Sequence, residues 1–126
     1  METNACIQTV SLKKGRLADK IPVIVQTILA DDDSNCIQKI YLFGSYAYGR
    51  PNKCSDIDIF VIIDNINNKL KLYGKLYGKI LKLMNNDYNA FDLLLQRCAD
   101  FELGLKENPQ GVESIINNSG VILYAR

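Results

Sequence analysis

The apolar residues of this chain follow a helical period in some segments and run almost without interruption in others. Residues 17–29 have helical spacing, with apolar side chains at Leu17, Ile21, Ile24, Val25, Ile28 and Leu29. Pro22 falls early in this segment, where a helix tolerates proline. The acidic run of residues 31–33 ends the helix and predicts a solvated loop. Up to about Gly15 the pattern is weak and predicts no element.

Later apolar runs predict strands. Residues 37–43 form a strand candidate that leads into a Gly-Ser turn, and residues 45–49 predict a single helical turn. Residues 57–63 are apolar almost throughout, which indicates a strand buried on both faces. Residues 89–96 and 121–124 predict a third strand and a short edge strand. Between them lie helical patterns around residues 101–105 and from Pro109 onward, ended by residues 117–120.

Residues 70–84 predict a helix in which Lys-Leu-Tyr-Gly occurs twice. The repeat aligns one apolar stripe, which faces either the core or a partner: Leu72, Tyr73, Leu76, Tyr77 and Ile80. Gly74 and Gly78 each cost about 1 kcal/mol relative to alanine, and would allow another backbone to pack closely. Five lysines in the same segment predict a solvated helix face: Lys69, Lys71, Lys75, Lys79 and Lys82.

Composition narrows the class of protein. With 126 residues, 48% of them hydrophobic, and no linker-like stretch, residues 1–126 predict one globular domain. The net charge of +1 favours neither a nucleic-acid template nor an acidic partner. The four cysteines lack Cys-x-x-Cys spacing, and no signal peptide or membrane-length apolar run is visible, so we expect a cytoplasmic protein with reduced thiols. The chain has no histidine, which excludes Ser-His and Cys-His catalysis.

The most informative motif is a Gly-Ser turn followed by two closely spaced aspartates. Gly44-Ser45 and Asp56-Ile57-Asp58 are separated by the ten residues 46–55. In a strand, Asp56 and Asp58 project to the same face, about 6–7 Å apart. Their mutual repulsion is relieved by a hard divalent cation such as Mg²⁺, which binds carboxylates together with substrate phosphates. Glycine allows a close backbone approach, and the Ser45 hydroxyl can donate to a phosphate, so the motif indicates nucleotide chemistry.

With this spacing the chain resembles the nucleotidyltransferase superfamily that includes DNA polymerase beta, whose signature is Gly-Ser followed by Asp-x-Asp. Ser-Asp-Ile-Asp followed by apolar residues is most similar to the minimal nucleotidyltransferases. The resemblance covers nearly the whole chain. It implies an α/β (α+β) fold with a small mixed β-sheet flanked by helices, the polymerase beta-like nucleotidyltransferase core.

The resemblance also implies site residues. The superfamily carries a third acidic residue on a later strand, and Asp92 matches it. An unpaired aspartate would be costly within this apolar pattern, and the alternative role for Asp92 is to pair with a buried Lys or Arg. The three carboxylates are expected to bind two Mg²⁺ ions, with Asp92 helping to deprotonate the acceptor. The nucleotide, ATP, would be held by Gly44, Ser45, Arg50 and Ser55.

One position departs from the family pattern. Many minimal members have arginine where this chain has Tyr48, so the positive charge that the family places at this point of the nucleotide site is missing here. Arg50 or Lys53, in the same loop, are candidates to replace it.

The resemblance implies an acceptor as well. Minimal nucleotidyltransferases commonly act beside a HEPN-class ribonuclease toxin, and as the antitoxin they transfer AMP to a toxin tyrosine. Two alternatives stay open. One is an enzyme that modifies small molecules, as aminoglycoside-modifying relatives do, completed by homo- or hetero-oligomer formation. The other is an antitoxin that acts by binding alone.

Overall fold

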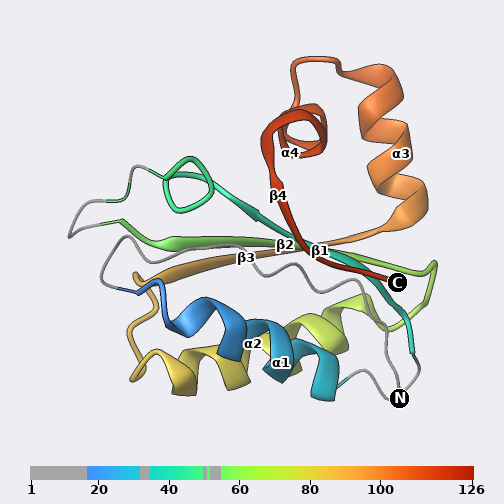
Figure 1. Ribbon diagram of the computed structural model, residues 1–126. Coiled ribbons are helices and arrows are strands. Elements are labelled where there is room, and N and C mark those ends of the chain that lie inside the picture. Colours follow the sequence, from blue (N-terminus) through green and yellow to red (C-terminus); the bar gives the residue numbers. More distant parts are fainter. Residues whose placement is uncertain (1–16, 32–34, 50, 52–54) are drawn as a thin grey trace.

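The protein is built on one mixed four-stranded sheet. The computed structural model in Figure 1 describes residues 17–31, 35–49, 51 and 55–126. The strand order is β3-β2-β1-β4. The strands are β1 (Ile37–Phe43), β2 (Ile57–Ile63), β3 (Phe91–Arg97) and β4 (Val121–Ala125). β1 runs antiparallel to β2 and β4, whereas β2 and β3 are parallel.

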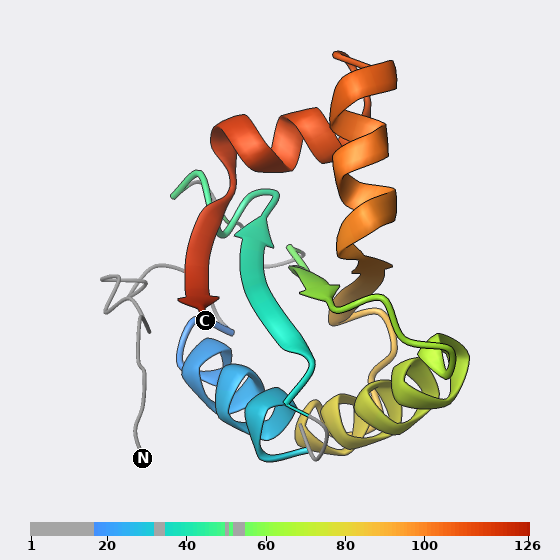
Figure 2. The same ribbon diagram turned by 90° about the vertical axis from the view of Figure 1, so that its right-hand side faces the viewer.

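Two helix pairs cover the two faces of this sheet, as Figures 1 and 2 show. The helices α1 (Lys20–Ala30) and α2 (Lys69–Leu83) lie on one face. The helices α3 (Cys98–Glu107) and α4 (Val112–Ser119) lie on the other. The expected small mixed sheet flanked by helices is therefore confirmed.

β2 is the central strand that joins the two cores. Ile57, Ile59, Val61 and Ile63 are buried in the core beneath α1 and α2. The alternate residues Phe60 and Ile62 are buried with Phe101 of α3 and Ile116 of α4. The strand is thus buried on both faces, as its continuous apolar run predicts. Asp58 has the same parity as Phe60, so it projects to the α3/α4 side.

The start of α4 differs from the prediction. Pro109 does not open the helix, which begins at Val112. The backbone N–H of Gly111 donates to the carbonyl of Asn108 (3.0 Å), and the Ser114 hydroxyl donates to the same oxygen (3.1 Å). This tight turn places Pro109 before the helix.

The acidic run after α1 also differs from the prediction at its first residue. Asp31 is buried, at 8% exposure, and its Oδ1 lies 2.5 Å from Nζ of Lys79 on α2. A solvated loop is therefore wrong for Asp31, because α1 and α2 pack side by side and bring a lysine to its carboxylate. Asp32 and Asp33 lie outside the described residues.

The repeat in α2 faces the core. Leu76 and Ile80 are fully buried, and Leu72, Tyr73 and Tyr77 are partly buried against them. This confirms the core-facing interpretation of the stripe. A Cβ on either glycine of the repeat would have no described atom within 4 Å apart from its chain neighbours and the backbone of its own helix.

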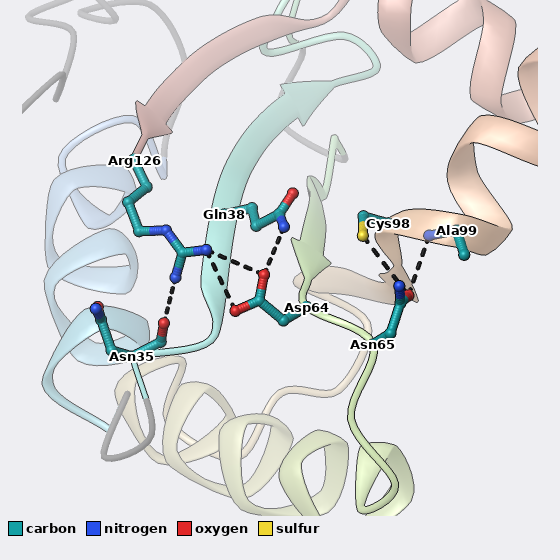
Figure 3. Close-up of polar contacts among 7 residues, drawn as sticks. All are labelled: Asn35, Gln38, Asp64, Asn65, Cys98, Ala99 and Arg126. Carbon is teal, nitrogen blue, oxygen red and sulfur yellow. Dashed lines mark hydrogen bonds and ion pairs between the residues drawn. The ribbon is translucent and has the colours of Figure 1, made fainter.

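A polar network ties down the end of the sheet opposite to Asp58 (Figure 3). Arg126 donates to the carbonyl of Asn35 and forms an ion pair with Asp64, with Nη2 and Oδ1 3.0 Å apart. Gln38 also donates to Asp64. The Gln38 hydrogen bond, and then Arg126, lower the pKa of Asp64.

None of the helices in the described part of the chain has both the length and the apolar character that a membrane-spanning helix needs.

Candidate active site

The turn that follows β1 is tight and partly buried. Gly44 has φ 76°, and its carbonyl accepts the backbone N–H groups of Ala47 (3.0 Å) and Tyr48 (3.2 Å). This arrangement matches the single helical turn predicted for residues 45–49. Tyr46 is buried and Ala47 packs against the core, while Tyr48 is exposed. We refer to this segment as the Gly44–Gly49 turn.

Gly44 lies directly against the carboxylate of Asp58. Phe43, the last residue of β1, pairs with Asp58 at the start of β2. A Cβ built on Gly44 would lie 2.0 Å from Oδ2 of Asp58. Any other residue at position 44 would therefore meet the carboxylate, and would also be strained by the positive φ. Two halves of the sequence motif, ten residues apart, are adjacent because β1 and β2 are antiparallel neighbours.

The sheet also brings the third carboxylate to this point. Asp92 of β3 is in register with Asp58 of β2, and strands in a sheet are spaced about 4.8 Å apart. Asp56 precedes Asp58 by two residues, and the N–H of Ile57 between them donates to the carbonyl of Ala90 (2.9 Å). The three aspartates that the sequence singled out are thus brought together.

The expected burial of Asp92 is wrong. Its side chain is exposed, although Phe91 and Leu93, which point to the opposite face of the same strand, are buried. Among the described residues, Asp92 forms no ion pair with Lys or Arg within 4.0 Å. The alternative in which it neutralises a buried cation therefore has no support.

The pKa of Asp58 is strongly raised in the site. Burial, followed by the charges of Asp56 and Asp92 and a hydrogen bond with Asp56, together raise the pKa of Asp58 to about 7. A carboxylate with this pKa gains much from a nearby cation, because a positive charge reverses both the desolvation cost and the repulsion.

The carboxylates fit a hard divalent cation by their chemistry. Oxygen ligands from two or three aspartates, with space for phosphate oxygens, are what Mg²⁺ binds. Within the described residues, no three acidic or thiol side chains already converge closely enough to form a complete metal site. The site is therefore a set of repelling ligands beside the Gly44–Gly49 turn, and substrate oxygens would complete the coordination.

The remaining predicted nucleotide ligands are only partly described. Ser45 and Ser55 are both partly buried, Ser45 next to Gly44 and Ser55 next to Asp56. Arg50 and Lys53 lie outside the described residues, so their proposed compensation for Tyr48 stays a prediction. Tyr48 itself is 48% exposed in the Gly44–Gly49 turn.

Two aromatic features near the site were not connected with it from the sequence: Tyr46 was not singled out, and Tyr73 and Tyr77 were singled out only as part of an apolar stripe. Tyr46 is buried in the turn, and an aromatic side chain directly after Gly-Ser was the available signal. On the other side, Tyr73 stacks on Tyr77 (ring centroids 5.9 Å apart), which contacts Phe91 (5.0 Å) next to Asp92. Burial, then Tyr77 and then Asp92, raise the pKa of Tyr73, so the charge of Asp92 is felt on α2.

Comparison with known families now decides the class of protein. The profile described as Polymerase beta, Nucleotidyltransferase matches residues 25–126. The chain belongs to this nucleotidyltransferase family. The match includes the turn and all three aspartates. No curated protein sequence matches the chain significantly.

Solved structures share the fold of this nucleotidyltransferase. A candidate nucleotidyltransferase from Sulfolobus solfataricus is 16% identical, with a TM-score of 0.55 over 88% of this chain and 82% of that chain. A toxin–antitoxin structure with AMP-PNP is 23% identical, with a TM-score of 0.53 over 82% and 73%. A double Asp-to-Glu mutant of the toxin–antitoxin MntA-HpeT is 21% identical, with a TM-score of 0.52 over 83% and 73%.

Proposed function

We propose that this nucleotidyltransferase moves AMP from ATP to a tyrosine of a partner HEPN-class ribonuclease toxin and thereby acts as an antitoxin. The observation that carries the proposal is the position of Asp58, which lies against Gly44 of the Gly44–Gly49 turn, in register with Asp92 and two residues after Asp56. Membership of the nucleotidyltransferase family supports the reaction type.

Each part of the site has a role in this proposal. Asp56 and Asp58 would hold a Mg²⁺ ion together with the triphosphate, and Asp92 would join them in holding a second ion. Bound Mg²⁺ neutralises phosphate charge and lowers the pKa of the acceptor hydroxyl. Gly44 and Ser45 would hold the β- and γ-phosphates, since glycine lets the phosphates approach the backbone and the serine hydroxyl donates to them.

The transfer breaks the phosphoanhydride bond between the α- and β-phosphates of ATP and forms a phosphate ester bond to the acceptor. The acceptor oxygen forms a bond to the α-phosphorus while the bond to the bridging oxygen of the leaving pyrophosphate breaks. Asp92 takes the proton from the acceptor hydroxyl. The products are the AMP ester of the acceptor and pyrophosphate.

The order of the strands supports a large acceptor. The turn follows β1 and Asp92 is on β3, while Asp58 is on β2, the strand between them, and Asp56 directly precedes that strand. In-line displacement places the acceptor opposite the leaving pyrophosphate, hence at the exposed β3 edge, which a protein surface can reach. Proteins with this fold are named as toxin–antitoxin pairs, among them one with AMP-PNP and one Tyr-to-Ala mutant.

The test is a transfer assay. The protein is incubated with Mg²⁺ and α-labelled ATP, with and without the product of the adjacent gene. We expect label on that partner with the wild type but not with Asp56→Ala/Asp58→Ala, while Asp100→Ala, a change of an exposed carboxylate on α3, leaves the transfer unchanged. Label on a purified aminoglycoside and on no protein would identify a small-molecule enzyme. Neutralisation of the partner by the inactive double variant would identify inhibition by binding alone.

A further inference from the structure

Tyr46 is the buried anchor of the Gly44–Gly49 turn. Its side chain is only 2% exposed and lies in the core formed with α1 and α2. Its hydroxyl accepts a hydrogen bond from the backbone N–H of Leu17, with 2.9 Å between nitrogen and oxygen. The bond joins residues 29 positions apart in the sequence.

The donor belongs to the first turn that leads into α1. Leu17 is 7% exposed, and its carbonyl accepts the N–H of Lys20, the first residue of the helix. The Leu17 N–H donates to the Tyr46 hydroxyl in a buried region, where an N–H group without an acceptor would lower the stability of the fold. A phenol in an apolar core likewise needs a partner for its hydroxyl. Each group satisfies the other.

This bond fixes the part of the turn that would meet the nucleotide. Tyr46 follows Ser45 directly and is two residues from Gly44, whose carbonyl is held by the two turn amides. Its ring points into the core, so Tyr46 cannot itself reach a nucleotide bound over Ser45. Any effect of Tyr46 on the substrate must pass through the positions of Gly44 and Ser45.

We propose that Tyr46 is a positioning residue for the triphosphate, which holds Gly44 and Ser45 in place by tying the Gly44–Gly49 turn to the start of α1. The inference rests on the proposed function, because it takes Gly44 and Ser45 as ligands of the β- and γ-phosphates. It makes ATP affinity depend on a hydrogen bond made outside the nucleotide site.

The test compares Tyr46→Phe with a matched control, Tyr124→Phe, which removes the hydroxyl of another largely buried tyrosine on β4. Affinities for ATP and for AMP are measured by calorimetry with Mg²⁺ present. We expect Tyr46→Phe to weaken ATP binding by about tenfold. AMP lacks the β- and γ-phosphates, so its affinity stays at the wild-type value. In transfer assays the KM for ATP rises more than kcat falls, and the control variant changes none of these quantities.

Leu17→Pro removes the same hydrogen bond from the donor side, because proline has no backbone N–H, and it also replaces a buried leucine side chain, so it is compared with Leu17→Ala, which keeps the N–H. Leu17→Pro should reproduce the selective loss of ATP affinity. Equal ATP affinity in Tyr46→Phe and wild type would overturn the inference. An equal loss for ATP and AMP would also overturn it, because that result indicates a general structural role.

Amide exchange separates this inference from the proposed function. Faster exchange of the Leu17, Ala47 and Tyr48 amides in Tyr46→Phe, without change in β2, is the expected sign of a released turn. A wild type that binds no nucleoside triphosphate would reject the proposed function and the positioning role together. Unchanged exchange combined with normal ATP binding by the wild type would reject the role of Tyr46 alone.

Discussion

Gly44 and Asp58 occupy adjoining space: a Cβ atom on Gly44 would lie 2.0 Å from Oδ2 of Asp58. The backbone of the turn after β1 and the carboxylate at the start of β2 therefore form one unit. A ligand held by that carboxylate is necessarily close to the Gly44 backbone, which is the arrangement that a metal–triphosphate complex requires.

Gly44→Ala should abolish transfer, because the new methyl group displaces the Asp58 carboxylate. The positive φ adds about 1–2 kcal/mol of strain for a residue with a Cβ. Gly49→Ala is the matched control, since Gly49 also has a positive φ (70°) but has no described atom within 4 Å of its Cβ position. Gly44→Ala should lose more stability in urea unfolding than Gly49→Ala, which has only the strain of the positive φ, and Gly49→Ala should retain most ATP binding. Equal loss of ATP binding in the two variants would contradict this account.

Asp58 should make the metal-free protein less stable as the pH rises. Its folded pKa of about 7 lies above the ordinary value of 3.8, so the folded state binds the proton more tightly. The stability that this proton gives is complete below pH 3.8 and is lost as the pH rises through 7. Asp58→Asn removes this dependence. In urea unfolding with chelator, the stability of Asp58→Asn relative to wild type should therefore increase between pH 4 and 7 and then level off.

Asp92→Asn should impair the reaction without affecting the fold. The side chain is exposed, so the substitution leaves the melting temperature within about 1 °C of wild type. Transfer should fall by at least about a hundredfold, because a group that assists acceptor deprotonation and metal binding is lost. ATP binding, measured by calorimetry, should fall far less. A variant with wild-type turnover would remove Asp92 from the mechanism.

Gly74→Ala and Gly78→Ala should each stabilise the protein by about 0.5–1 kcal/mol. Alanine is the better helix former, and a Cβ at either position meets no described atom within 4 Å. Gly104→Ala in α3 is the control, because its Cβ would approach the Glu113 side chain to 2.5 Å. That contact disturbs the hydrogen bond from Gln96 to Glu113. Urea midpoints should rise for the α2 variants only.

Arg126→Gln should lower stability by less than about 1 kcal/mol at pH 7, since the ion pair with Asp64 is partly exposed to solvent. The Gln38 hydrogen bond, and then Arg126, lower the pKa of Asp64 from its ordinary value of 3.8, so the stabilisation is present above pH 3.8. It is lost as the pH falls through the lower, folded pKa. The difference in stability between wild type and variant should therefore be smaller in strong acid and in high salt than at pH 7.

The sequence predicted the local elements well, and the errors have identifiable physical causes. The strands over residues 37–43 and 57–63 have the predicted bounds, because continuous apolar runs are a strong local signal. Pro109 did not open α4, because the Asn108–Gly111 turn uses it instead. Asp31 was expected to be solvated and is buried, whereas Asp92 was expected to be buried and is exposed. Burial depends on which element packs against a residue, and the local pattern does not contain that information.

By itself, the sequence determined which residues carry the chemistry: a Gly-Ser turn, two aspartates separated by a single residue, and a third aspartate in a later strand. These features are local, because spacing along a strand fixes the face to which each side chain points. Only the tertiary structure decided which of them meet. Antiparallel pairing of β1 with β2 placed Gly44 against Asp58, and parallel pairing of β2 with β3 placed Asp92 in register with it. The bond from Leu17 to Tyr46 and the pair of Asp31 with Lys79 arose the same way, because each joins segments that only the packing of α1 brings together.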